Sequence, residues 1–126
     1  MTGAYVTGRN AGLVFTDWPL MNGQLIPDRG PLTDVHFTHR LVAAVVGVVL
    51  ATVAFQAWRW QRHQPVIVGT AAAAFALYLG QVMIGAGQVW TKLSDPYVVL
   101  HVAAGSLIWC LMVFLVLASV YQARRD

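Results

Sequence analysis

The sequence predicts an all-α fold: a polytopic membrane helix bundle with three complete transmembrane helices and the tail of a preceding one. Of the 126 residues, 58% are hydrophobic and only 10% are charged, whereas a soluble domain usually carries about a quarter charged residues. The stretches 41–58, 64–91 and 96–123 contain no Asp, Glu, Lys or Arg. A membrane-spanning helix needs ~20 mostly apolar residues. Each stretch can therefore cross a bilayer once, provided that the first helix begins further back, near Asp34.

Residues 1–35 are predicted to be a loop, apart from Met1–Val6, which resembles the end of an earlier helix. Glycine and proline recur through this segment and favour turns over long helices. They are Gly3, Gly8, Gly12, Pro19, Gly23, Pro27, Gly30 and Pro31. Because a structureless segment of ~30 residues is usually functional, we expect this loop to cover a site.

The predicted transmembrane helices cover about 35–58, 66–91 and 96–121, all in a single membrane domain of residues 1–126. Thr33 or Asp34 is a favourable N-cap for the first helix. Ser94 or Asp95 caps the third helix, where Pro96 takes the preferred first position. Since the connection before the third helix is short, the first and third helices should start at the same membrane face.

Two histidines, His39 and His101, lie near the starts of these two helices and, counted from the caps, within about one turn of the same depth. Ionisable side chains at membrane depth are rare, and each is a hypothesis for a functional site. Neutral imidazoles bind iron well, and helical bundles hold cofactors between facing helices. The pair therefore predicts a flat ligand, such as a porphyrin held from both sides.

Small residues follow each histidine on its helical face: Ala43, Gly47, Ala104 and Gly105. They would leave room for a large flat ligand, but small residues also allow ordinary close packing of membrane helices. The middle helix shows the packing pattern without any histidine, at Ala72, Ala76 and Gly80. The small residues alone therefore do not separate the two interpretations.

Arg40 follows His39 and has two interpretations. Its guanidinium suits the recognition of carboxylates such as haem propionates, or it could be an anchor that snorkels to the interface. Arg9 and Lys92 are weaker candidates for binding haem propionates.

Three further side chains have less specific predictions. His36 is expected to be an interfacial or pocket-lining residue, because a zinc or copper site would need more ligands than the sequence offers near it. Cys110, the only cysteine, is expected to be a buried and inert thiol. Gln81 should find a hydrogen-bond partner inside the bundle.

The charge pattern predicts topology more than partners. A formal net charge of +3 is too small and dispersed to indicate nucleic acid. Arg59 and Arg62 crowd one short loop, and Arg124 and Arg125 lie on the same side. The basic residues of the other side are spread over a longer segment. Basic residues in short loops mark the cytoplasmic side, so the C-terminus is predicted to be cytoplasmic and the histidine pair to lie toward the outer face.

Several motifs, in order along nearly the whole chain, resemble the haem A synthase family. They are Gly3-Ala4-Tyr5-Val6-Thr7-Gly8-Arg9-Asn10-Ala11-Gly12, Thr16-Asp17-Trp18-Pro19-Leu20-Met21-Asn22-Gly23, Ile26-Pro27, Phe37-Thr38-His39-Arg40 and Leu100-His101. The Trp-Pro-Leu-Met-Asn-Gly loop is the most distinctive of them.

The resemblance implies the C-terminal half of an eight-helix enzyme of the inner (plasma) membrane. That enzyme oxidises the methyl group of haem O to the formyl group of haem A, for cytochrome oxidase. By analogy, His39 and His101 would be the axial iron ligands of a cofactor haem b, while the substrate haem O would bind in the other half. Family members place a glutamate three residues before the first histidine of that other half. This chain has His36 at the matching position and no glutamate anywhere.

The catalytic residues therefore remain unknown, and we expect activity to require the N-terminal half or a second copy. The implied partners are the lipid bilayer, haem and, further, haem O synthase. The alternative is a non-catalytic membrane electron-transfer protein with a bis-histidine haem b. A structural subunit whose histidines form only hydrogen bonds is the third hypothesis.

Overall fold

The computed structural model describes residues 2–124, with only the backbone described at Thr2. Met1 and Arg125, used in the predictions above, lie outside this range. Four helices follow one another along the chain: α1 Thr2–Gly8, α2 Pro31–Trp60, α3 Pro65–Trp90 and α4 Asp95–Ala123. Within residues 2–124 the only strand-like pairing is an isolated bridge between Met21 and Gln24. The all-α prediction is confirmed.

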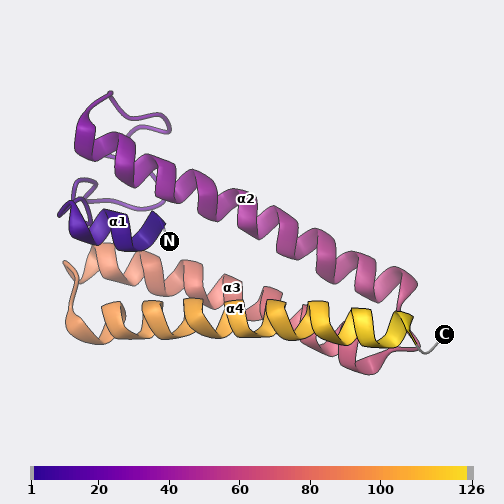
Figure 1. Cartoon of the computed structure of the whole chain (residues 1–126). Helices are drawn as coiled ribbons and strands as arrows, with labels where there is room; N and C mark the ends of the chain where they lie inside the picture. Colours follow the sequence, from indigo (N-terminus) through magenta and orange to yellow (C-terminus); the bar gives the residue numbers. More distant parts are fainter. Residues whose placement is uncertain (1, 125–126) are drawn as a thin grey trace.

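The three long helices are each long and apolar enough to cross a membrane. They expose many large apolar side chains, as expected for helices whose outer faces contact lipid. Helices α3 and α4 run side by side, while α2 separates from them toward its Pro31 end, where α1 packs against it (Figure 1).

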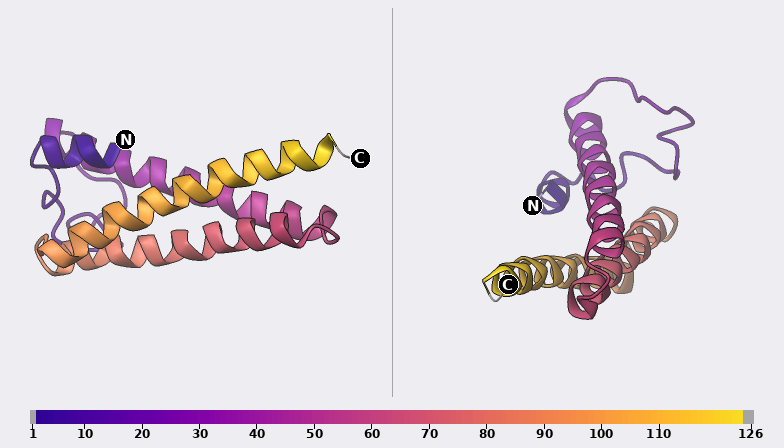
Figure 2. Two further views of the ribbon diagram at one scale, coloured as in Figure 1. Left: turned by 60° about the horizontal axis from the view of Figure 1, so that its bottom comes forward. Right: turned by 90° about the vertical axis from the view of Figure 1, so that its right-hand side faces the viewer.

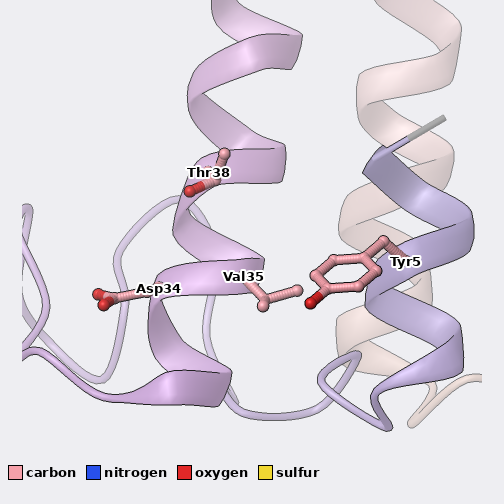
Figure 3. Close-up of a pocket in the computed structure, with 4 residues that line it drawn as sticks. All are labelled: Tyr5, Asp34, Val35 and Thr38. Carbon is pink, nitrogen blue, oxygen red and sulfur yellow. The ribbon is translucent and has the colours of Figure 1, made fainter.

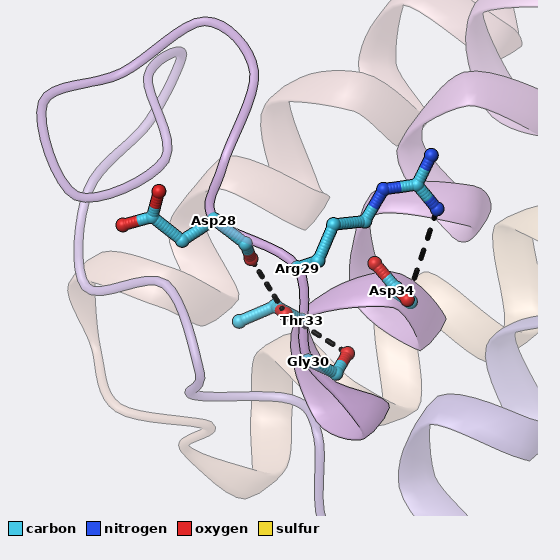
Figure 4. A network of polar contacts seen from close by, with 5 residues as sticks. All are labelled: Asp28, Arg29, Gly30, Thr33 and Asp34. Atoms are coloured by element: carbon cyan, nitrogen blue, oxygen red, sulfur yellow. Dashed lines mark hydrogen bonds and ion pairs between the residues drawn. The ribbon is translucent and has the colours of Figure 1, made fainter.

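Helix α2 begins earlier than the sequence predicted. Its N-cap is Gly30, whose backbone is extended, and Pro31 follows inside the first turn, where a missing N–H costs nothing. The predicted caps Thr33 and Asp34 are wrong. The hydroxyl of Thr33 instead contacts the carbonyl oxygens of Asp28 (3.0 Å) and Gly30 (2.9 Å), and Asp34 forms an exposed ion pair with Arg29 at 3.9 Å (Figure 4).

The start of α4 matches the sequence more closely. Ser94 is the cap, as predicted, although its side chain makes no capping hydrogen bond. Its hydroxyl donates to Thr91 Oγ1 at 3.1 Å instead. The turn before it places Lys92 and Leu93 in the left-handed region, with φ of 52° and 63°, which allows α4 to reverse direction directly after α3.

A small apolar core joins the three long helices at the end where α2 turns into α3. It consists of Ala57, Ile67, Ala71 and Leu115. The small residues that pack α3 are Ala71, Ala74 and Ala86. The predicted packing residues Ala72, Ala76 and Gly80 lie on the exposed face instead, because the rotation of α3 about its axis directs a different stripe toward its neighbours.

Cys110 is also placed differently from the prediction. Its thiol is exposed on the outward face of α4, where it lines a shallow apolar groove with Trp109 and Phe114. The expectation of a buried thiol was wrong because α4 packs along one side only, against α3, which leaves the middle of its outer face uncovered.

The loop between α1 and α2 is ordered by its own polar contacts. The carboxylate of Asp17 accepts hydrogen bonds from the backbone N–H groups of Asn22 (2.5 Å) and Gly23 (2.8 Å). The bond from Gly23 is the main cause that holds the pKa of Asp17 below its ordinary value. Asn22 and Gly23 have φ of 54° and 80°, so the tight turn depends on residues that tolerate the left-handed region.

Candidate functional site

The two predicted histidines meet in the structure. The ring centroids of His39 on α2 and His101 on α4 lie 6.5 Å apart, with an angle of 67° between the ring planes. No Cα atom of α2 approaches one of α4 within 8 Å, and the right-hand view of Figure 2 shows the Pro31 end of α2 standing away from α4. The imidazoles therefore face each other across a gap between helices that do not pack directly.

This spacing suits a pair of axial metal ligands. A ring nitrogen binds a transition metal at about 2 Å and the ring centre lies about 1 Å behind it, so opposed imidazoles on one ion have centroids about 6 Å apart. Within residues 2–124, no group of three or more His, Cys, Asp or Glu side chains could hold a metal ion. Two imidazoles are a sufficient protein ligand set for haem iron, because the porphyrin supplies the remaining nitrogens.

Each histidine lies against a glycine of another helix. A methyl group at Gly3 of α1 would lie 3.5 Å from His39 Cε1, and one at Gly85 of α3 would lie 3.2 Å from His101 Cε1. The absence of a side chain at both positions lets the rings tuck against neighbouring backbone. Sequence spacing could not identify these glycines, because both belong to helices other than those that carry the histidines.

Three of the small residues that follow the histidines contact side chains of α3. The ring of Tyr78 on α3 occupies the space beside Gly47, and its hydroxyl donates to the carbonyl oxygen of Ala43 at 2.7 Å. Gly105 faces the side-chain amide of Gln81. These contacts support the close-packing interpretation for Ala43, Gly47 and Gly105. The three residues do not provide space for a flat ligand.

His36 and Arg40 bind the α1–α2 loop to the start of α2. His36 is 6% exposed, its Nδ1 lies 2.9 Å from the carbonyl oxygen of Ala11, and its Nε2 accepts a hydrogen bond from Arg40 Nε at 3.4 Å. The ring of Phe15 lies 5.0 Å from the His36 ring and 5.2 Å from Arg40 Cζ. His36 is thus a buried anchor for the loop.

The remaining nitrogens of Arg40 continue this attachment. Its terminal N–H groups donate to the carbonyl oxygens of Leu20 (2.9 Å), Asp17 (3.2 Å) and Pro19 (3.5 Å). With the bond to His36, these contacts engage four of the five donors of the guanidinium. We call His36, Arg40 and Phe15, with the loop carbonyls that they contact, the loop latch. It holds the loop beside His39, the neighbour of Arg40.

Arg9, a weaker candidate for binding haem propionates, contacts Tyr5 of α1 in the structure. Arg9 is exposed and donates to the hydroxyl of Tyr5 at 2.9 Å.

An open cleft of about 200 Å³ lies between α1 and α2 and is lined by Tyr5, Asp34, Val35 and Thr38 (Figure 3). Ligand pockets usually measure ~300–1,000 Å³, so this cleft is small for a porphyrin.

Comparison with known proteins identifies the family. Residues 1–113 match the family described as cytochrome oxidase assembly protein. Heme A synthase of Shouchella clausii is 36% identical over 90% of this chain and 38% of its own length. The chain belongs to the haem A synthase family. Heme A synthases of Rhodospirillum centenum (33% identical over 86% of this chain) and Ruegeria sp. (32% over 100%) agree. No solved structure matches.

This haem A synthase family member spans only part of the length of its relatives. The matched regions cover 38% of the Shouchella clausii protein, 33% of the Rhodospirillum centenum protein and 36% of the Ruegeria protein. Membership therefore gives the family and the membrane setting, while the activity of the longer relatives is carried over only as a proposal.

Proposed function

We propose that this chain is the haem-binding C-terminal half of a haem A synthase, with His39 and His101 as the axial ligands of a cofactor haem b. The observation that carries the proposal is the approach of the two imidazoles, 6.5 Å between centroids, across a gap between α2 and α4. The relatives named Heme A synthase support a role in haem A biosynthesis, and the proposed reaction is oxidation of the methyl group of haem O to the formyl group of haem A.

His39 and His101 would hold the haem, which would supply electron transfer when bound. That chemistry suits the proposed reaction, in which oxidation of a methyl group must release electrons. The chain's own contribution is to hold the ligands: α2 and α4 present the imidazoles, and Gly3 and Gly85 let the rings lie close to neighbouring backbone.

The substrate haem O is proposed to bind elsewhere, in an N-terminal half or in a second copy. The sequence contains no glutamate, and the position three before His39 is His36, which is engaged with Ala11 and Arg40 in the loop latch. Because His36 is committed to this anchor, it is not proposed as an acid or base for the reaction.

Arg40 has two proposed roles that are compatible. Its contacts with the loop latch support a structural one, and one N–H of its guanidinium remains beyond the four bonds described. A haem propionate is the partner proposed for that donor. In the proposed topology the histidine pair and the latched loop lie toward the outer face of the plasma membrane and the C-terminus is cytoplasmic.

Optical spectroscopy of the purified full chain, reconstituted with haem, tests the ligand assignment. We expect a low-spin bis-histidine haem spectrum, lost in both His39→Ala and His101→Ala, because either change leaves the iron with one protein ligand. His63→Ala is the matched control, since His63 is exposed in the α2–α3 connection. Retention of the spectrum in both single variants would reject the assignment.

The alternative is a bis-histidine haem b protein that transfers electrons without making haem A. The approach of His39 and His101 supports it as well, because two imidazoles are all that a bis-histidine haem requires from the protein. Both candidates predict the same spectrum, so only haem A formation separates them.

A further inference from the structure

Two buried side-chain atoms within the described residues have no hydrogen-bond partner: Gln81 Oε1 and His101 Nδ1. Buried polar atoms almost always have a hydrogen-bond partner, so each buried atom without one requires an explanation. The two atoms belong to facing helices, α3 and α4. They are also chemically complementary, because an amide oxygen only accepts hydrogen bonds and a protonated ring nitrogen donates one.

The same two residues already share one contact. Gln81 Nε2 donates to the backbone carbonyl oxygen of His101 at 2.7 Å, which places the amide group beside the histidine. Gly85, one turn further along α3, faces the imidazole, and a methyl group there would lie 3.6 Å from His101 Nδ1. Gln81 and Gly85 therefore present one face of α3 to His101, with the polar group next to the open backbone position.

A histidine that binds metal through one ring nitrogen almost always donates its other N–H to a carbonyl, carboxylate or water, which fixes the tautomer and the ring orientation. In His101 one ring nitrogen, Nδ1, is buried and has no such partner among the described residues. If Nε2 faces the iron, Nδ1 carries the proton and needs an acceptor. The unsatisfied oxygen of Gln81 is the acceptor that the α3–α4 contact offers.

We propose that Gln81 is a positioning residue for His101: Nδ1–H donates to one bridging water, the water donates to the side-chain oxygen of Gln81, and these bonds hold the imidazole with Nε2 toward the haem iron. A buried water typically makes about three hydrogen bonds to otherwise unsatisfied polar groups, so a single molecule can serve both atoms. The inference rests on the proposed haem ligation and adds a residue from α3, which carries no histidine.

The test measures the redox midpoint potential and the ferric electron paramagnetic resonance spectrum of the haem-loaded full chain. Hydrogen bonding from Nδ1 raises the basicity of the ligand and favours ferric iron. Gln81→Met keeps the shape and removes both hydrogen bonds. We expect it to shift the redox equilibrium about tenfold toward ferrous iron, which is ~59 mV for one electron, with an altered low-spin signal.

Gln81→Glu separates the two hydrogen bonds, because it keeps an acceptor and loses the donor to the His101 carbonyl oxygen. It should match the unmutated potential or move to the opposite side of it from Gln81→Met. If it behaves like Gln81→Met instead, the donor bond is the relevant one and the proposal is wrong.

Gln88→Leu is the matched control, since Gln88 Nε2 donates to the Tyr97 carbonyl oxygen at 3.2 Å, a bond of the same kind between the same helices. Its potential should stay unchanged. A shift in Gln88→Leu equal to that in Gln81→Met, or no shift in Gln81→Met, would overturn the inference while leaving the ligation intact. Failure of the unmutated chain to bind haem would overturn the proposed function, and the inference with it.

Discussion

At the scale of single residues, the absence of one side chain decides how α2 meets α3. Gly47 is buried, and a Cβ built there would lie 2.5 Å from the hydroxyl oxygen of Tyr78. The same hydroxyl donates to the Ala43 carbonyl oxygen at 2.7 Å. The tyrosine thus fills the notch at Gly47 and bonds to the backbone one turn away, which links the two helices by shape and by a hydrogen bond.

Gly47→Ala should destabilise the bundle by about 1–3 kcal/mol, because the added methyl forces the tyrosine ring out of its place. Gly80→Ala is the control. Nothing lies within 4 Å of a Cβ at Gly80, so this change should be neutral or stabilise the helix by up to ~1 kcal/mol. Thermal unfolding in detergent micelles measures both, and equal effects of the two changes would contradict this account of Gly47.

At the scale of elements, the loop latch converts an irregular segment into a fixed cover at one end of the bundle. The loop is held on α2 through His36 and Arg40. It reaches α3 through an edge-on contact of Trp18 with Trp90, 6.1 Å between centroids. Two separate helices therefore hold one loop, beside the end of the bundle where the histidines lie.

Arg40→Gln should loosen the loop, since most of the bonds to the loop carbonyls are lost. We expect tryptic cleavage after the exposed Arg29 to become about tenfold faster, equivalent to ~1.4 kcal/mol of local stability.

Arg62→Gln is the matched control for this variant. Arg62 likewise stacks on an aromatic ring, that of Trp58 at 4.8 Å, but at the opposite end of α2. Its removal should leave the cleavage rate after Arg29 unchanged. Comparable cleavage in the Arg40 variant and the unmutated chain would show that the latch does not hold the loop.

At the scale of the whole molecule, the partial coverage of the relatives bears on activity. The chain matches about a third to two fifths of the length of the heme A synthases compared above. The proposed function places the substrate haem outside these residues. The chain should therefore bind the cofactor haem even when it forms no haem A.

Expression in cells that make haem O but lack their own haem A synthase checks this separation. We expect no haem A from this chain alone, and haem A when a family N-terminal half is expressed with it, as measured by chromatography of extracted haems. The His39→Ala variant, expressed with the same half, is the control and should fail. Haem A formed by the chain alone would show that residues 1–126, in one copy or in two together, form a complete active site.

The sequence by itself determined three helices long and apolar enough to cross a membrane, and it placed His39 and His101 near the starts of two of them. Both follow from local properties: the length of uncharged stretches and the count of residues from a helix start. Only the tertiary structure decided which residues surround that pair. Gly3, Gly85 and Gln81 reach the histidines from other helices, and His36 and Arg40 bind a distant loop. The rotation of each helix and the path of the loop depend on contacts far apart in the chain, which no local pattern specifies.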